Sequence, residues 1–305
     1  MVVAAFFFAT MGVCVKYGSA SFNPAELVFY RGVIGVAFMA VLARSQGIRL
    51  ATRYPGMHAW RSTIGVFSLT AWFYAIAHLP LATAMTLNYM SSVWIAAFLV
   101  GGALLSWRPT RDDAGRGPGA STPLLNGPLV ATVLAGFAGV VLMLRPSLNE
   151  GEGFAGLIGL LSGLSAAFAY MQVMALSRLN EPETRTVFYF AVGSAVAGAV
   201  GMLFTGLSPW HWQSALWLLP IGLLAALGQL CMTRAYARAG SQSAMLVVAN
   251  LQYSGIVFAA AYSIALFGDH ITPLGWAGMA LIVGSGIAAT VLRARAAPDA
   301  PAEEH

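Results

Sequence analysis

The sequence predicts an all-α integral membrane protein with ten transmembrane helices, arranged as two inverted five-helix repeats. Three observations predict this fold class: an apolar composition, continuous apolar runs of transmembrane length, and an internal repeat with an odd number of helices per copy. Of the 305 residues, 58% are hydrophobic and 9% are charged, whereas soluble domains carry about 25% charged residues. The solvent of this chain is therefore a lipid bilayer.

The apolar runs define ten expected spans. A bilayer core of roughly 30 Å requires about 20 apolar residues per helix. The runs that approach this length are residues 1–18, 25–43, 60–78, 82–105, 127–144, 155–177, 186–207, 214–237, 242–267 and 274–292. Because these runs are continuous and do not alternate with polar residues, they indicate helices and exclude a transmembrane barrel.

Basic residues predict the orientation. One side of the expected topology holds Arg44, Arg49, Arg53, Arg61, Arg108, Arg111, Arg116, Arg178, Arg185, Arg234, Arg238, Arg293 and Arg295, and the other holds Lys16, Arg31 and Arg145. The positive-inside rule then places both termini in the cytoplasm of a bacterial-type inner (plasma) membrane. The net charge of +5 reflects this topology, so we expect no nucleic-acid partner.

The two halves of the chain repeat each other. "VFYRGV" (28–33) matches "VFYFAV" (187–192), and similar matches occur in the same order along both halves. We expect a first repeat at 1–145 with a cytoplasmic insertion at 106–126, a second repeat at 153–293, and a cytoplasmic tail at 294–305. Since five helices are an odd number, the second copy crosses the membrane in the opposite sense, which is typical of secondary transporters.

Three stretches carry a family resemblance. They are "FYRGVIGVAFM" (29–39), "WFYAIAHLPLATAMTLNYMS" (72–91) and "LQYSGIVFAAAYSIALFGDHITPLGWAGMALIVGSGI" (251–287). With the ten spans, they resemble the EamA-type transporters of the drug/metabolite transporter superfamily. The resemblance implies transport of a small solute by alternating access.

Two positions depart from that family pattern. Ser92 stands where the family often has Pro, and Leu104–Leu105 stands where a Gly-Glu pair usually ends the helix. The second repeat keeps the acidic counterpart as Gly268–Asp269. Local bending and capping of the fourth helix are therefore the features that the sequence leaves open.

Polar residues within the spans are the candidates for solute binding. Asn88, Ser91 and Ser92 share one helix face, and Asn250 and Tyr253 repeat this spacing in the other half. The set expected to line a central cavity is Asn88, Ser91, Ser92, Trp72, Asn250, Tyr253, Gln172, Gln229 and Arg31. The alternative is hydrogen bonding between helices, which such side chains also provide.

Arg31 is the most unusual candidate, because charged side chains inside a membrane are costly. It aligns with Phe190 of the other repeat, so the fold does not require a charge there. Contact with solute, a gating role, snorkelling to the interface and pairing with Glu26 all remain open.

No Asp or Glu falls in the central part of an expected span. The sequence therefore favours a neutral, zwitterionic or anionic metabolite, such as an amino acid, over a lipophilic cation. We expect no metal, no other cofactor and no catalytic residues, because no nucleophile, base or ligand cluster has the spacing of an enzyme site. A non-transporting receptor or structural protein, or a membrane-embedded enzyme, are the alternatives; a homodimer also stays open.

Overall fold

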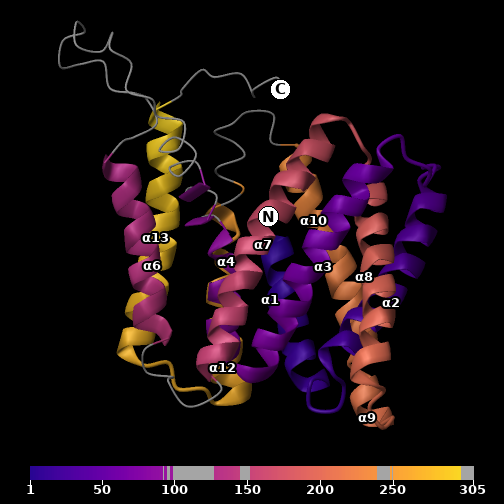
Figure 1. Ribbon diagram of the computed structural model, residues 1–305, viewed down its shortest axis with the longest axis horizontal. Coiled ribbons are helices and arrows are strands. Elements are labelled where there is room, and N and C mark those ends of the chain that lie inside the picture. The colour runs from indigo at the N-terminus through magenta and orange to yellow at the C-terminus, as the bar shows by residue number, and fades with distance from the viewer. Residues whose placement is uncertain are drawn as a thin grey trace, which may run out of the picture.

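The structure is a helical bundle, and a computed structural model describes residues 1–91, 93–94, 97–98, 127–144, 152–238, 248 and 250–296 (Figure 1). The elements are α1 (Val2–Gly18), α2 (Pro24–Ser45), α3 (Pro55–His78), α4 (Leu81–Tyr89), α6 (Gly127–Leu144), α7 (Glu152–Arg178), α8 (Glu183–Thr205), α9 (Trp212–Ala215), α10 (Leu218–Ala237), α12 (Ser254–Phe267) and α13 (Pro273–Ala296). The described residues contain no strand, so the all-α prediction is confirmed.

Length and composition make this a membrane fold. Within the described residues, four helical stretches are long and apolar enough to cross a bilayer: Pro24–Ser45, Gly153–Arg178, Glu183–Thr205 and Trp212–Ala237. The outer surface is rich in apolar side chains, such as Leu203 and Phe204, which are 83% and 85% exposed. Large apolar surfaces of this kind need a lipid environment.

Two expected spans differ in detail from the observed helices. The span at 214–237 is divided into α9 and α10, because the helix is interrupted at Leu216 and Trp217. The span at 82–105 begins as α4, which ends at Tyr89 with Met90 as its C-cap. Ser92, Leu104 and Leu105, where the chain departs from the family pattern, lie outside the described residues.

Helix ends follow local sequence signals. Asn23 and Glu26 form a capping box at the start of α2, with Pro24 in the first turn, and this pairing satisfies two backbone N–H groups that would otherwise lack partners. At the other end of the chain, Gly268 caps α12 in the left-handed conformation, with φ of 64°. The backbone N–H of Asp269 then donates a hydrogen bond to the carbonyl of Ser263, so Gly268 and Asp269 end this helix.

A pseudo-twofold axis relates the helix packing of the first half to that of the second. The helices α1, α2, α3 and α6 of the first half correspond to α7, α8, α10 and α13 of the second, while α4 and α12 are parts of the fourth helix of each half. Helix α3 packs on α7 as α10 packs on α1, α3 packs on α8 as α10 packs on α2, and α4 packs on α7 as α12 packs on α1. The pairs α2–α8, α4–α12 and α6–α13 join corresponding helices directly, and the α6–α13 pair stands at one side of the bundle (Figure 1).

Corresponding helices run antiparallel, as inverted repeats require. A methyl group on Gly32 would lie 2.3 Å from the backbone nitrogen of Ala195, and one on Gly198 would lie 2.5 Å from that of Phe29. Residue numbers therefore rise along α2 as they fall along α8. The pseudo-twofold axis consequently runs across the helices and not along them.

Both halves also contain an interrupted helix at corresponding places. The helical run that begins with α4 is interrupted at Met90, and the residues before α12 are interrupted at Gln252 and Tyr253. At each place, backbone N–H groups bond to the carbonyl three residues earlier, from Met90 to Leu87 and from Tyr253 to Asn250. Such breaks near the middle of a span are typical of transporter binding sites.

Candidate solute-binding site

A cavity lies in the middle of the bundle, between the two halves. The space inside it that is open to a water-sized group is about 50 Å³, so the side chains of the wall pack closely around it. Its lining comes from α1, α3, α4 and α7, with one residue each of α2, α8 and α10. The residues are Phe8, Met11, Arg31, Arg61, Gly65, Ser68, Leu69, Trp72, Asn88, Tyr89, Ala166, Ala169, Tyr170, Phe190 and Gln229.

Two arginines share one aromatic ring in this wall. The guanidinium carbon of Arg31 lies 4.8 Å from the ring centroid of Phe190, and that of Arg61 lies 3.9 Å from it. Arg31 Nη1 donates to Ser194 Oγ at 3.0 Å, and Arg61 Nη2 donates to Gln229 Oε1 at 3.3 Å. The cavity therefore carries positive charge that reaches it from both α2 and α3.

Polar groups on α3, α4 and α7 connect next to the cavity. Asn88 Nδ2 donates to Ser162 Oγ at 3.1 Å, and Ser162 Oγ donates to the Gly159 carbonyl at 2.6 Å. Ser68 Oγ donates to the Ser162 carbonyl at 2.8 Å. Asn88 and Ser68 thus combine two roles, since each lines the cavity and each holds α7 in place.

One end of the bundle is closed by Glu26, in a set of bonds that we name the Glu26 contact. The Glu26 carboxylate accepts hydrogen bonds from Ser208 N at 2.8 Å and Ser208 Oγ at 2.6 Å. Asn23 Nδ2 donates to the Gly206 carbonyl at 3.2 Å. These bonds join the turn between α1 and α2 to the segment between α8 and α9, so they connect the two halves.

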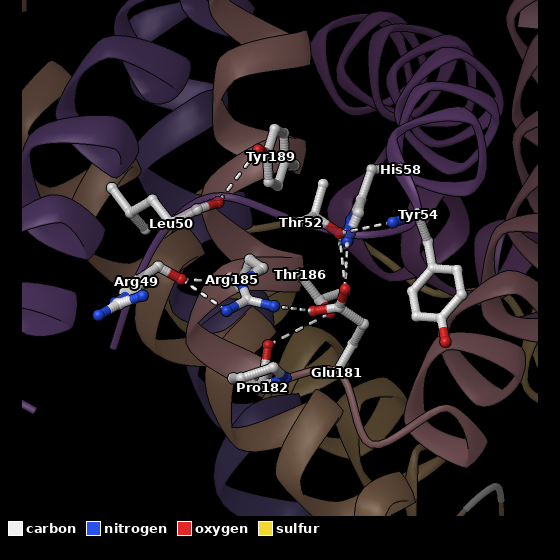
Figure 2. Close-up of polar contacts among 10 residues, drawn as sticks. All are labelled: Arg49, Leu50, Thr52, Tyr54, His58, Glu181, Pro182, Arg185, Thr186 and Tyr189. Atoms are coloured by element: carbon white, nitrogen blue, oxygen red, sulfur yellow. Dashed lines mark hydrogen bonds and ion pairs between the residues drawn. The ribbon is translucent and has the colours of Figure 1, made fainter. Parts of the chain in front are cut away.

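The opposite end is closed by Glu181, in what we name the Glu181 contact (Figure 2). Glu181 accepts hydrogen bonds from Thr52 Oγ1 at 2.6 Å and from Arg185 Nη1 at 2.7 Å. Arg185 also donates to the Arg49 carbonyl, through Nε at 3.0 Å and Nη2 at 2.6 Å. The turn between α7 and α8 is thereby joined to the loop between α2 and α3, which is the counterpart of the Glu26 contact under the pseudo-twofold.

Charge and burial shape the Glu181 contact further. His58 Nε2 lies 3.8 Å from Glu181 Oε1, and its ring stacks on Tyr189 at 4.6 Å between centroids. Burial alone raises the pKa of the Glu181 carboxyl, but hydrogen bonds from Thr52 and Arg185 and the nearby positive charge outweigh it. The pKa of Glu181 therefore lies below its ordinary value, and the carboxylate is ionised when the contact is formed.

Comparison with known proteins identifies the family. The EamA-like transporter family matches residues 1–107. The pseudopaline exporter CntI of Pseudomonas aeruginosa is 31% identical over 288 residues, which cover 94% of this chain and 93% of the exporter. The chain belongs to the EamA-like transporter family.

Further relatives agree with this EamA-like assignment. A riboflavin transporter of Rhizobium johnstonii is 28% identical over 244 residues, covering 78% of this chain and 74% of the relative. A solved crystal structure shares the fold, with a TM-score of 0.57 and 20% identity over 95% of this chain and 98% of the other. The protein is thus a multi-pass membrane protein of a bacterial transporter family.

The EamA-like chain brings four of the predicted site residues together at the cavity: Arg31, Trp72, Asn88 and Gln229. Ser91, Gln172, Asn250 and Tyr253 are not among its described lining residues. Ser91 is buried, and Gln172 and Asn250 are partly buried. Tyr253 packs against Gly286 of α13. Ser92 lies outside the described residues.

The structure corrects the interpretation of Arg61 and excludes two of the four interpretations of Arg31. The orientation argument counts Arg61 among the basic residues of the cytoplasmic loops and tail, but α3 begins at Pro55, so Arg61 lies in the second turn of that helix and is 3% exposed. Arg31 neither snorkels nor pairs with Glu26, because it points to Phe190 and Ser194.

Sequence reasoning also missed Ser68, Tyr89, Tyr170 and Phe190 as lining residues. A usable signal existed for Arg61, which falls inside the expected span at 60–78. The aromatic residues gave no such signal, since aromatic side chains are common throughout the spans.

Proposed function

We propose that this EamA-like chain is a secondary transporter that binds a small polar metabolite in the central cavity and carries it across the membrane by alternating access. The solute is neutral, zwitterionic or anionic. The observation that carries the proposal is the cavity itself, which lies between two inverted halves and is lined by Asn88, Ser68 and Gln229 among aromatic side chains.

The two end contacts support the alternating-access part of the proposal. The Glu26 contact and the Glu181 contact occupy corresponding places at opposite ends, and each joins one half of the chain to the other. Breaking either set costs a few hydrogen bonds, and each net bond contributes about 1 kcal/mol. Opening one end while the other stays closed is therefore a change between states of similar free energy, which a bound solute can shift.

The names of the relatives support a metabolite as the solute without specifying it. One relative exports pseudopaline and another transports riboflavin. For this chain, the described carboxylates at Glu26, Glu181 and Asp269 lie at helix ends or turns and not on the cavity wall. The wall therefore offers amide, hydroxyl, aromatic and guanidinium groups to the solute.

The test measures uptake and access in the same proteoliposomes. Cys14 and Cys231 are replaced by Ala, and Ala169→Cys places a thiol on the cavity wall. A membrane-impermeant maleimide is added from either side, and uptake is measured for a radiolabelled panel of amino acids, nucleosides and small carboxylates. Cysteine pairs at Glu26 and Ser208, or at Thr52 and Glu181, then fix one end with a bifunctional thiol reagent.

We expect the thiol to react from both sides in the uncross-linked protein. Fixing either end should abolish reaction from that side, leave reaction from the opposite side, and stop uptake. Continued labelling from both sides with one end fixed would contradict alternating access. Binding of a panel solute without any uptake by the unmodified chain would favour the receptor alternative.

A further inference from the structure

The two buried arginines of the cavity lack the partner that such cations normally require. Arg31 and Arg61 are 4% and 3% exposed. Among the residues that the structure describes, no carboxylate lies within 4.0 Å of either guanidinium. The ion pairs of these residues join His58 and Arg185 to Glu181, and neither includes Arg31 or Arg61. Their side-chain hydrogen bonds go to the neutral groups of Ser194 and Gln229.

Several of their N–H donors are also unused. Arg31 Nε, Arg61 Nε and Arg61 Nη1 are buried and have no hydrogen-bond acceptor among the described residues. A guanidinium presents five N–H donors in a planar fork, and this fork matches the two oxygens of a carboxylate. The cavity therefore presents donor groups and positive charge without an internal anion to receive them.

The pseudo-twofold shows that the fold does not need this charge. In the matching stretches "VFYRGV" and "VFYFAV", Arg31 corresponds to Phe190, and these two residues meet where α2 crosses α8. The ring of Phe190 faces both guanidinium groups and provides a cation–π contact to each. Such a contact partly stabilises the cations in the protein without solute, yet leaves their N–H groups available.

From this geometry we infer that Arg31 and Arg61 bind a carboxylate of the solute, so that the solute is a small organic acid or a zwitterion with an uncharged, apolar body. The inference rests on the proposed function, because it assumes that the solute occupies this cavity. The apolar character of the rest of the solute is inferred from the other lining residues, since Trp72, Tyr89 and Phe8 surround the same space.

Matched probes separate charge from shape. Acetate with acetamide, and benzoate with benzamide, form two pairs that differ in charge but little in size. Each probe is titrated against the purified full chain in detergent, and the melting temperature is recorded, because a ligand of the folded state raises it. We expect each carboxylate to bind at least about tenfold more tightly than its amide, and benzoate more tightly than acetate.

The variants Arg31→Gln and Arg61→Gln should each remove most of the tenfold preference. Arg61→Lys keeps the charge and should retain part of it, which a general folding defect would not explain. Arg53→Gln is the matched control, since Arg53 is exposed on the loop before α3, and its preference should equal that of the unmodified chain. Without probe, Arg61→Gln should melt at a higher temperature than the unmodified chain, because an uncompensated buried cation is removed.

Two results would overturn the inference. One is that the unmodified chain shows no carboxylate-dependent shift, or binds carboxylates and amides equally. The other is that both Gln variants keep the full preference. If neutral panel solutes are still taken up in proteoliposomes, the proposed function stands and only the solute class is wrong; if no solute moves, the proposed function fails separately.

Discussion

The hydrogen bond between Asn88 and Ser162 allows the binding role of α4 to be separated from its packing role. Asn88 lines the cavity, whereas Ser162 does not, although the two side chains are joined at 3.1 Å. Ser162→Ala removes this hydrogen bond and the bond from Ser162 Oγ to the Gly159 carbonyl, and it leaves the cavity wall intact. Asn88→Ala removes both the bond and a solute-facing group.

The structure sets the size of the expected effects. Hydrogen bonds between membrane helices contribute about 0.6 kcal/mol on average and about 1.7 kcal/mol at most. Ser162 Oγ keeps its own bond to Gly159 when Asn88 is lost, so no hydroxyl donor is left unpaired there. We therefore expect a coupling free energy of about 0.6 to 1.7 kcal/mol between the two sites.

The assay is a double-mutant cycle for unfolding in detergent, combined with solute uptake in proteoliposomes. Both single variants should lose stability, and the double variant should lose less than the sum of the two losses. Uptake should fall about tenfold or more for Asn88→Ala, since about 1.4 kcal/mol of binding corresponds to one decade, and less than about twofold for Ser162→Ala when corrected for folded protein. Equal uptake by the two variants would refute the assignment of Asn88 to the solute.

Two further expectations concern packing and pH. Gly32→Ala should lower the unfolding free energy by about 1 to 3 kcal/mol, because a methyl group there meets the backbone of Ala195. Gly284→Ala, which meets nothing within 4 Å, should be neutral or stabilise by about 0.5 to 1 kcal/mol; equal effects would show that α2 and α8 are not in close contact. The folded pKa of Glu181 is lowered from 4.5, so its contribution is present above that pH and is lost as pH falls through the folded value. Unfolding measured against pH should therefore show a loss in acid that is smaller in Glu181→Gln, and identical curves would contradict the Glu181 contact.

The fold was predictable because it depends on patterns that extend over many residues. Continuous apolar runs decide that helices form, and the match of "VFYRGV" with "VFYFAV" indicates the repeat. Interruptions such as the one at Leu216 and Trp217 were not predictable. They depend on the position of the chain at the end of the bundle and not on apolar periodicity, which continues through them.

The cavity was predictable only in part, since it depends on which faces of several helices meet. Asn88 and Gln229 stood out because polar groups are rare in apolar spans. Arg61 was misassigned because the topology rule treats every basic residue near a helix end as a loop residue, and a shift of five residues in the start of α3 changes its environment from water to protein interior. Asn250 shares the spacing of Asn88, yet it is not among the residues that line the cavity.

The two halves can match in helix packing and still differ in the side chains that face the cavity. A pseudo-twofold needs matching helix packing, so that the open and closed arrangements of the two ends resemble each other in free energy. It does not need matching side chains on the axis. Two arginines in the places of Arg31 and Phe190 would bring like charges together where α2 crosses α8. Two phenylalanines would leave Arg61 of α3 as the one cation among the described lining residues. With one of each, the ring of Phe190 lies against both guanidinium groups, and the two arginines among the described lining residues both come from the first half, Arg31 on α2 and Arg61 on α3.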